Sequence, residues 1–187
     1  MDFETLLINR RSVRNYRDKE VPLPLIETIL EDTCLAPTAG NRQPCRFVVI
    51  RDRALIKRLS DDSKRSLRDD LTRTPDIPAK RHEERLNNEA FNVFYNAPCL
   101  IYIIGPDDLP SLNVDCGLTA AYLMFSATAR GLATCWIGLG AYVRDRRLLD
   151  EIGVPEGQRI VAPIILGYPE AIPTAAERHP PAIVKAL

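Results

Sequence analysis

The side chains best suited to chemistry gather near the N-terminus, in ten residues with four arginines and one serine: Ile8-Asn9-Arg10-Arg11-Ser12-Val13-Arg14-Asn15-Tyr16-Arg17. A guanidinium group forms planar, two-pronged hydrogen bonds to phosphate, and a neighbouring hydroxyl can add another. Spacing alone leaves two interpretations open. The stretch is either a binding site for one small anion or the solvated, charged end of the first helix.

A second candidate is the loop at residues 37–44, which reads Pro-Thr-Ala-Gly-Asn-Arg-Gln-Pro. Its turn residues predict a connector that follows a helix stop. Alternatively, Thr38, Asn41 and Gln43 could hydrogen-bond the edge of a heterocycle, because binding sites concentrate on loops. Both interpretations stay open at this point.

A third candidate is the run from Ala133 to Gly140, which predicts a strand that enters a glycine-containing loop. Glycines beside Trp136 would let main-chain amides approach a flat ligand closely, although Trp136 could also be a core residue. A dinucleotide-binding fingerprint is not supported. Position 143 is valine where a third glycine is needed, and no parallel βαβ unit surrounds the run.

Composition argues against several classes of function. The 187 residues include 25 basic and 25 acidic side chains, so no overall field favours nucleic acid or an anionic membrane, and we expect neither as a partner. No apolar run reaches the ~18 residues of a membrane span. Asp2 and Glu4 interrupt the N-terminus, which therefore has no signal-peptide pattern, and we expect a cytoplasmic protein.

Cysteine and histidine usage gives no sign of a metal site or a hydrolase. The five cysteines form an odd set without a C-x-x-C pair, and each lies in an apolar or strand-like context, so we expect buried, reduced thiols. His82 and His179 lie far apart and outside any ligand-like or nucleophile motif.

The three candidate stretches lie within an alternation of helices and strands that has no internal repeat. Helices are expected over residues 2–9, 22–36, 114–130 and 145–152 and from residue 52 onward, and strands over 45–50, 100–104 and 159–166 and from residue 133. The strand at 100–104 is continuously apolar, which is typical of burial on both faces. The helix at 114–130, with Asn113 as its expected cap, has almost no polar side, so we expect it to be buried centrally or at a subunit interface.

Two segments depart from this alternation. Residues 51–89 hold 11 basic and 9 acidic side chains among 39, so we expect an exposed helical excursion or mobile lid, at about residues 59–95, that adds little to the core. The last twenty residues hold four prolines and no periodicity, which predicts an extended arm that lies on a partner subunit. No composition shift divides the chain, so residues 1–187 are expected to form one domain.

Four motifs, in order along the chain, resemble those of the nitroreductase family of flavoproteins. Residues 10–16, Arg-Arg-Ser-Val-Arg-Asn-Tyr, are similar to the family's R-R-S-x-R-x-[FY] signature, and residues 37–44 to its P-[ST]-[AS]-x-N-x-Q-P loop. Residues 131–138, Gly-Leu-Ala-Thr-Cys-Trp-Ile-Gly, resemble its G-L-x-[ST]-x-W-[IL]-G segment, and Gly167-Tyr168-Pro169 its G-Y/x-P. The resemblance runs from about residue 3 to residue 185.

The resemblance implies an α+β fold in which helices wrap a small, mostly antiparallel sheet, and a homodimer with one FMN at each of two interface sites. By match to the motifs, the FMN phosphate and ribityl chain would be held by Arg10, Arg11, Ser12 and Arg14. The isoalloxazine ring would be lined from the other subunit by Pro37, Thr38 and Ala39, with Asn41 and Gln43 in support. Backbone amides near the reactive edge of the ring would come from Trp136, Ile137, Gly138 and Leu139.

Two further features of the family are matched less closely. The C-terminal basic pair that reaches the phosphate is Arg178-His179 here, and only Arg178 keeps the pattern. A basic or amide side chain near the flavin pyrimidine has four candidates in the middle region, Lys64, Arg65, Arg68 and Arg73, among which the sequence does not choose.

The implied function is an FMN-dependent oxidoreductase that passes hydride from NADH or NADPH through flavin to a small electron-poor acceptor such as a nitroaromatic or quinone. The chemistry belongs to the cofactor, so no catalytic side chain and no metal is expected. Other flavin chemistry, such as reductive dehalogenation, and a flavin-binding regulatory protein with little turnover are the alternatives. The sequence leaves open the physiological acceptor and the choice between the two donors.

Overall fold

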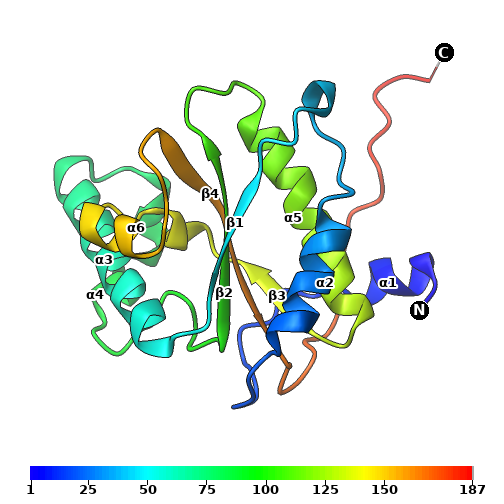
Figure 1. The fold of residues 1–187 in the computed structure, drawn as a ribbon, viewed down its shortest axis with the longest axis horizontal. Coiled ribbons are helices and arrows are strands. Elements are labelled where there is room, and N and C mark those ends of the chain that lie inside the picture. The colour runs from blue at the N-terminus through cyan, green and yellow to red at the C-terminus, as the bar shows by residue number, and fades with distance from the viewer. Residues whose placement is uncertain (187) are drawn as a thin grey trace.

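A four-stranded sheet forms the centre of the structure, a computed structural model that describes residues 1–186 (Figure 1). The strands are β1 (Arg46–Ile50), β2 (Cys99–Pro106), β3 (Ala133–Trp136) and β4 (Gln158–Gly167). Their order across the sheet is β1-β2-β4-β3, and every neighbouring pair is antiparallel. Each strand lies where the apolar and β-branched runs predict one, and the α+β fold class is confirmed.

Helices surround this sheet. The α-helices in the described residues are α1 (Phe3–Asn9), α2 (Leu23–Thr33), α3 (Arg53–Arg73), α4 (Glu83–Asn87), α5 (Leu112–Ala129) and α6 (Arg146–Glu151). Short 3₁₀ turns are η1 (Ala39–Asn41), η2 (Pro78–His82) and η3 (Gly138–Ala141). Local sequence explains several starts: the carboxylates of Asp2, Asp52 and Asp145 each accept hydrogen bonds from backbone amides in the first turn of the helix that follows.

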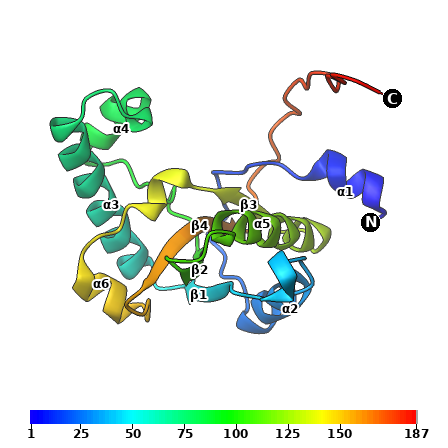
Figure 2. The ribbon, with the colours of Figure 1, turned by 90° about the horizontal axis from the view of Figure 1, so that it is seen from above.

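Strand β2 separates two apolar layers, as its unbroken hydrophobic sequence predicts. Leu100 and Tyr102 point into one layer and Ile101 and Ile103 into the other, and all four are fully buried. Helices α2 and α5 cover the second layer, and α3 and α6 cover the first (Figure 2). The sheet is therefore closed on both faces, and binding sites must lie at its edges and ends.

The arginine stretch runs along one edge of this sheet. Helix α1 ends at Asn9, and the extended chain beyond it pairs in parallel with β3, where Ser12 lies opposite Thr134. The Val13 amide donates to the Thr134 carbonyl at 3.0 Å, and the Arg17 amide donates to the Tyr168 carbonyl at 2.9 Å. The stretch is therefore an added edge segment of the sheet and not a solvated helix end.

The charged segment from residue 51 to 89 buries more apolar side chains than its composition predicts. Ile56 and Leu59 of α3 enter the main core, and Leu67 and Leu71 join Leu86 of α4 in a small cluster of their own. On α3 these apolar residues, together with the buried Ser60, Ser63 and Lys64 between them, follow helical spacing, so a helix with many charges still buries one face. The expectation that this segment adds little core is wrong, although its far end projects from the sheet in Figure 2.

Helix α5 also differs from expectation. It begins two residues earlier than predicted, after Ser111, and Asn113 accepts a hydrogen bond from Arg159 at 2.8 Å instead of capping the helix. One face of α5 is buried, but Val114, Leu118 and Tyr122 are 65%, 40% and 40% exposed. The helix is therefore not buried on all sides within one copy of the chain.

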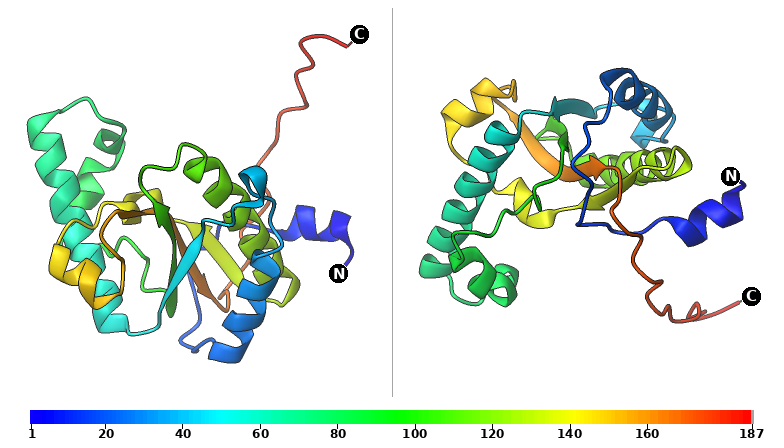
Figure 3. Two further views of the ribbon diagram at one scale, coloured as in Figure 1. Left: turned by 45° about the horizontal axis from the view of Figure 1, so that its top comes forward. Right: turned by 90° about the horizontal axis from the view of Figure 1, so that it is seen from below.

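Two of the five cysteines are less buried than expected. Cys34 is exposed and Cys45 half-buried, so the expectation of five buried thiols is correct only for Cys99, Cys116 and Cys135. Residues 168–186 of the C-terminal arm form no helix or strand, as predicted, and the arm leaves the body on the same side as α1 (Figure 3). No helix within residues 1–186 has the length and apolar character needed to span a membrane.

Candidate functional site

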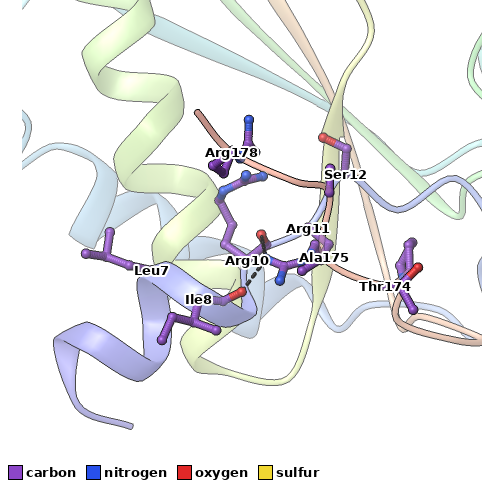
Figure 4. A pocket seen from close by; sticks show the side chains of 10 residues that line it. Leu7, Ile8, Arg10, Arg11, Ser12, Thr174, Ala175 and Arg178 are labelled. Carbon is purple, nitrogen blue, oxygen red and sulfur yellow. Dashed lines mark hydrogen bonds between the residues drawn. The ribbon is translucent and has the colours of Figure 1, made fainter. Parts of the chain in front are cut away.

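A cavity of about 520 Å³ lies between the end of α1 and the C-terminal arm (Figure 4). It brings Arg178 together with Arg10, Arg11 and Ser12, although Arg178 lies more than 160 positions further along the chain. The arm also contributes residues 173–176, and Leu7 and Ile8 of α1 form an apolar wall. No lining residue is acidic, so the cavity has the positive potential that a phosphate group requires.

The two adjacent arginines of this cavity have different hydrogen-bond partners. Arg11 Nη1 donates to the carbonyls of Ile8 and Arg10 and so closes the last turn of α1. Figure 4 shows the Arg10 side chain extending toward Arg178 instead. Arg10, Ser12 and Arg178 are therefore the groups best placed to hold an anion in this cavity.

Arg14 lies further along the sheet edge, outside the lining of this cavity. Its guanidinium carbon is 5.7 Å from the centre of the Tyr95 ring, a cation–π distance. Because the stretch runs parallel to β3 from the Ser12–Thr134 pair, Arg14 is displaced from Ser12 in the direction of Trp136. From Arg10 to Arg14, the chain therefore runs along the sheet edge from the anion cavity toward the third candidate stretch, residues 133–140.

The stretch from Trp136 to Leu139 offers exposed backbone at the end of β3. The Ile137 amide donates to the Pro163 carbonyl at 2.8 Å, so this amide is already used. Gly138 and Leu139 begin η3, and the first amides of a helix have no partner within it. A Cβ added at Gly138 would meet nothing within 4 Å, so a flat ligand has room to approach here.

The loop at residues 37–44 lies elsewhere in the same chain. The Ala39 amide donates to Asp115 Oδ1 at 2.8 Å, which fixes the loop at the first turn of α5. Thr38 accepts from the Gln43 amide at 3.0 Å, and the Gln43 side chain donates to Asn41 at 3.2 Å. The loop borders a separate cavity of about 180 Å³, so one copy of the chain does not bring it to the arginines.

Two of the four middle-region candidates have structural roles. Lys64 is only 4% exposed, and its ammonium group donates to the carbonyls of Asn88, Glu89 and Phe91 at 3.4, 3.1 and 2.8 Å. Arg65 pairs with Asp62 on the same helix. The Lys64 ammonium group is therefore used within the fold, whereas Arg65 is exposed apart from this pair. Arg65, Arg68 and Arg73 stay as predictions.

Several residues near these sites were missed by the sequence analysis. Asp62 is 2% exposed and accepts from the amides of Arg144 and Asp145 at 2.7 and 3.1 Å, which holds the loop that follows η3. Cys45 and Cys116, 71 positions apart, bring their sulfur atoms within 3.5 Å. Neither arrangement has a local sequence signal, because each depends on contacts between distant elements.

Comparison with known proteins places these features in a family. A sequence model of the Nitroreductase family matches residues 7–168. A protein of Archaeoglobus fulgidus, provisionally named NADH dehydrogenase/NAD(P)H nitroreductase, is 28% identical over 176 residues, which cover 88% of this chain and 84% of the relative.

Solved structures agree with this assignment at the level of the fold. A nitroreductase from Bacteroides fragilis, solved with bound FMN, superposes with a TM-score of 0.83 at 23% identity and covers 100% of this chain and 99% of its own. Iodotyrosine deiodinase, solved with FMN and 3-iodo-L-tyrosine, gives a TM-score of 0.74 at 21% identity, with 96% of both chains covered. From the family match over residues 7–168, the chain belongs to the nitroreductase family.

Proposed function

We propose that this protein is an FMN-dependent oxidoreductase that passes electrons from NADH or NADPH to an electron-poor acceptor such as a nitroaromatic or a quinone. The observation that carries the proposal is the line of groups along the β3 edge. A cationic cavity with Arg10, Ser12 and Arg178 lies at one end, and the open backbone at Gly138 lies at the other. FMN has the same polarity, with a phosphate at one end and a flat ring at the other.

The residues present suit this cofactor. The cavity volume of about 520 Å³ lies within the range of roughly 300–1,000 Å³ that is usual for ligand pockets. Its donors are guanidinium and hydroxyl groups, which suit a phosphate dianion. The buried Thr134 hydroxyl, opposite Ser12, has no hydrogen-bond partner within residues 1–186, so a polar atom is still unsatisfied at this edge.

The chain's own groups bind and position, while bound FMN supplies the transfer of two electrons between donor and acceptor. Arg10, Ser12 and Arg178 anchor the phosphate, and Arg14 lies beside the path from phosphate to ring. The amides of Gly138 and Leu139 are the donors closest to where the ring would lie, and they can stabilise negative charge there. No side chain needs to act as a nucleophile.

A second copy of the chain would complete the site. The loop at residues 37–44 is held at the opposite end of α5 from the arginine cavity. The exposed apolar face of α5, with Leu118 and Tyr122, and the exposed Phe3 and Ile8 of α1 suit a homodimer. In such a dimer Pro37, Thr38 and Ala39 of one copy would line the ring held by the other.

The test uses purified protein and its visible spectrum. We expect yellow protein whose flavin bands bleach when NADH or NADPH is added without oxygen and return when a nitroaromatic or quinone follows. Colourless protein that cannot be reconstituted with FMN would contradict the proposal.

Reductive dehalogenation is the second candidate, because iodotyrosine deiodinase shares the fold. At 21% identity that likeness shows the fold alone, so product analysis with halogenated phenols must decide. A flavin-binding protein with little turnover would be reoxidised no faster by any acceptor than by oxygen.

A further inference from the structure

A third cavity borders the ring end of the proposed flavin site. Its volume is about 250 Å³. It is lined from η2 by Pro78, Ala79, Arg81 and His82, and from η3 and the residue after it by Gly138, Leu139 and Tyr142. Gly138 and Leu139 therefore face both the proposed ring position and this cavity. Its other wall comes from the charged excursion, which is held here because the Ser63 hydroxyl donates to the Leu139 carbonyl.

The charges around this cavity are unbalanced. Lys80, which does not line it, is paired with Glu83 at 2.7 Å. Arg81 has no carboxylate within 4.0 Å in residues 1–186, and its Nε donates to His82 Nε2 at 3.2 Å. Burial and the charges of Arg81 and Arg85 lower the pKa of His82, so His82 accepts from Arg81 as a neutral ring. No residue that lines the cavity is acidic.

The remaining surfaces of the cavity are apolar or flat. Ala79 is buried, Leu139 packs against the small cluster of α3 and α4, and Gly138 carries no side chain. Such walls accept the face of an aromatic ring, while a guanidinium group at the mouth can form a two-pronged hydrogen bond to a carboxylate. A volume of about 250 Å³ falls below the roughly 300–1,000 Å³ of pockets for larger ligands, which favours one substituted ring over a whole dinucleotide.

We propose that this cavity binds the carboxylate of an aromatic electron acceptor, with Arg81 as its main partner, so that the protein prefers nitroaromatic acids to neutral nitroaromatics. This inference rests on the proposed function, because it assigns the class of acceptor at the same site. A phosphate of the nicotinamide donor carries the same kind of charge, so the experiment includes both donors.

The first measurement needs no turnover. Benzoate and benzamide have nearly the same shape and differ in charge, and calorimetric titration of the protein as purified compares their affinities. We expect measurable binding of benzoate that weakens with added salt, and weaker binding of benzamide. Equal affinities, or no binding of benzoate, would overturn the assignment of this cavity without bearing on whether the protein binds FMN.

The second measurement uses FMN-loaded protein and the ratio of kcat/KM for 4-nitrobenzoate to that for 4-nitrobenzamide. In Arg81→Ala we expect this ratio to fall about tenfold, mainly through the KM for the acid, because one charge-assisted hydrogen-bonded pair is lost. Arg81→Lys should recover part of the ratio, since it keeps the charge but not the planar fork. Arg85→Ala, which removes an exposed arginine of α4 outside the cavity lining, is the matched control and should leave the ratio unchanged.

Three outcomes would overturn the proposal. The acid-to-amide ratio could stay constant in Arg81→Ala with no change in the KM for either donor, or it could fall equally in Arg85→Ala. Alternatively, Arg81→Ala could raise the KM for NADPH while leaving the ratio of acceptors unchanged, which would assign the anion to the donor.

Discussion

Four arginines within eight residues have at least three different environments. Arg11 donates to backbone carbonyls at the end of α1, Arg10 faces Arg178 across the cavity, and Arg14 stacks on Tyr95. A cluster of like charges is therefore not one functional unit. Its members differ because each is fixed by the backbone direction at its own position.

This division predicts which arginine matters most for phosphate binding. Arg10→Ala should weaken FMN binding by ~1.5–3 kcal/mol, the usual range for a hydrogen bond to a charged group. Titration of protein freed of flavin with FMN measures the change. Arg17→Ala, in the same stretch but outside the cavity lining, is the control and should bind FMN normally. Equal losses in both variants would mean that only the overall charge of the stretch matters.

The thiols of Cys45 and Cys116 form a second pair whose members differ. The two sulfur atoms lie 3.5 Å apart, and Thr119 donates to Cys45 Sγ at 3.4 Å. The hydrogen bond with Cys116 lowers the pKa of Cys45 to about 7. The same hydrogen bond, together with burial, raises the pKa of Cys116. Cys45 also borders the cavity beside the loop at residues 37–44, so a reagent can reach it.

We therefore expect the alkylation rate of Cys45 to rise as the pH increases through about 7 and then to level off. The thiolate is the reactive form, and an ordinary thiol would continue to gain reactivity up to pH ~8.5. Iodoacetamide labelling followed by peptide mass spectrometry gives the midpoint. In Cys116→Ala the midpoint should move upward, and an identical midpoint in the two proteins would show that Cys116 has no influence.

At the scale of elements, α3 connects the excursion to the body. Lys64 lies on its buried face, and the ammonium group bridges the helix to three carbonyls at residues 88–91. Such a contact stabilises the return of the chain toward β2, because one ammonium group fixes three carbonyls of that segment to α3. The charged residue here is part of the packing.

Lys64→Met should lower the free energy of unfolding by ~2–4 kcal/mol, since three charge-assisted hydrogen bonds from a buried ammonium group are lost. Lys57→Met is a matched control on the same helix, because Lys57 is exposed and pairs only with Asp61 four residues later. A surface pair of this kind contributes ~0.3–0.5 kcal/mol. Denaturant unfolding of both variants at equal flavin saturation compares them, and equal losses would contradict a structural role for Lys64.

Substitutions at the two glycines of η3 test where the flavin ring lies. Gly138 is open, whereas a Cβ at Gly140 would clash with the buried Phe94 ring and lie 3.2 Å from Pro163 Cβ. Gly140→Ala should therefore destabilise the fold by ~1–3 kcal/mol. Gly138→Ala should fold normally but bind FMN less tightly, because its methyl group would occupy the space assigned to the ring. Unchanged FMN affinity in Gly138→Ala would place the ring elsewhere.

At the scale of the whole molecule, one copy presents two parts of a site that do not meet. The arginine cavity lies beside α1 and the arm, and the loop at residues 37–44 is fixed to the first turn of α5 by Asp115. The exposed side of α5 between them is apolar. Pairing of two copies through this face would bury the apolar side chains and bring the two parts together.

Leu118→Glu should therefore convert a dimer into a monomer and reduce FMN content together with it, because a buried, unpaired carboxylate opposes association. Light scattering after size-exclusion chromatography gives the mass, and the ratio of flavin to protein absorbance gives the content. Arg147→Glu, on α6 at the other face of the sheet, should affect neither. A monomeric wild type that binds FMN fully would rule out the shared site.

The sequence by itself determined the elements that rely on local signals. Strand β2 follows from its continuous apolar run, α3 and α6 from their aspartate caps, and the lack of regular structure in the arm from its prolines. The four motifs also predicted the family, because residue types at fixed spacing can be compared without knowing how the chain packs.

Only the tertiary structure decided which of these residues meet. It showed that Arg178 lines the same cavity as Arg10 and that the buried Lys64 donates to backbone carbonyls. It also showed that α5 has an exposed apolar face. It also placed Arg81 and Gly138 in the lining of one cavity, which no spacing rule predicts. The physical reason is that these contacts join positions tens of residues apart. Their formation depends on how the helices pack on the two faces of the sheet, and local propensity contains no information about that packing.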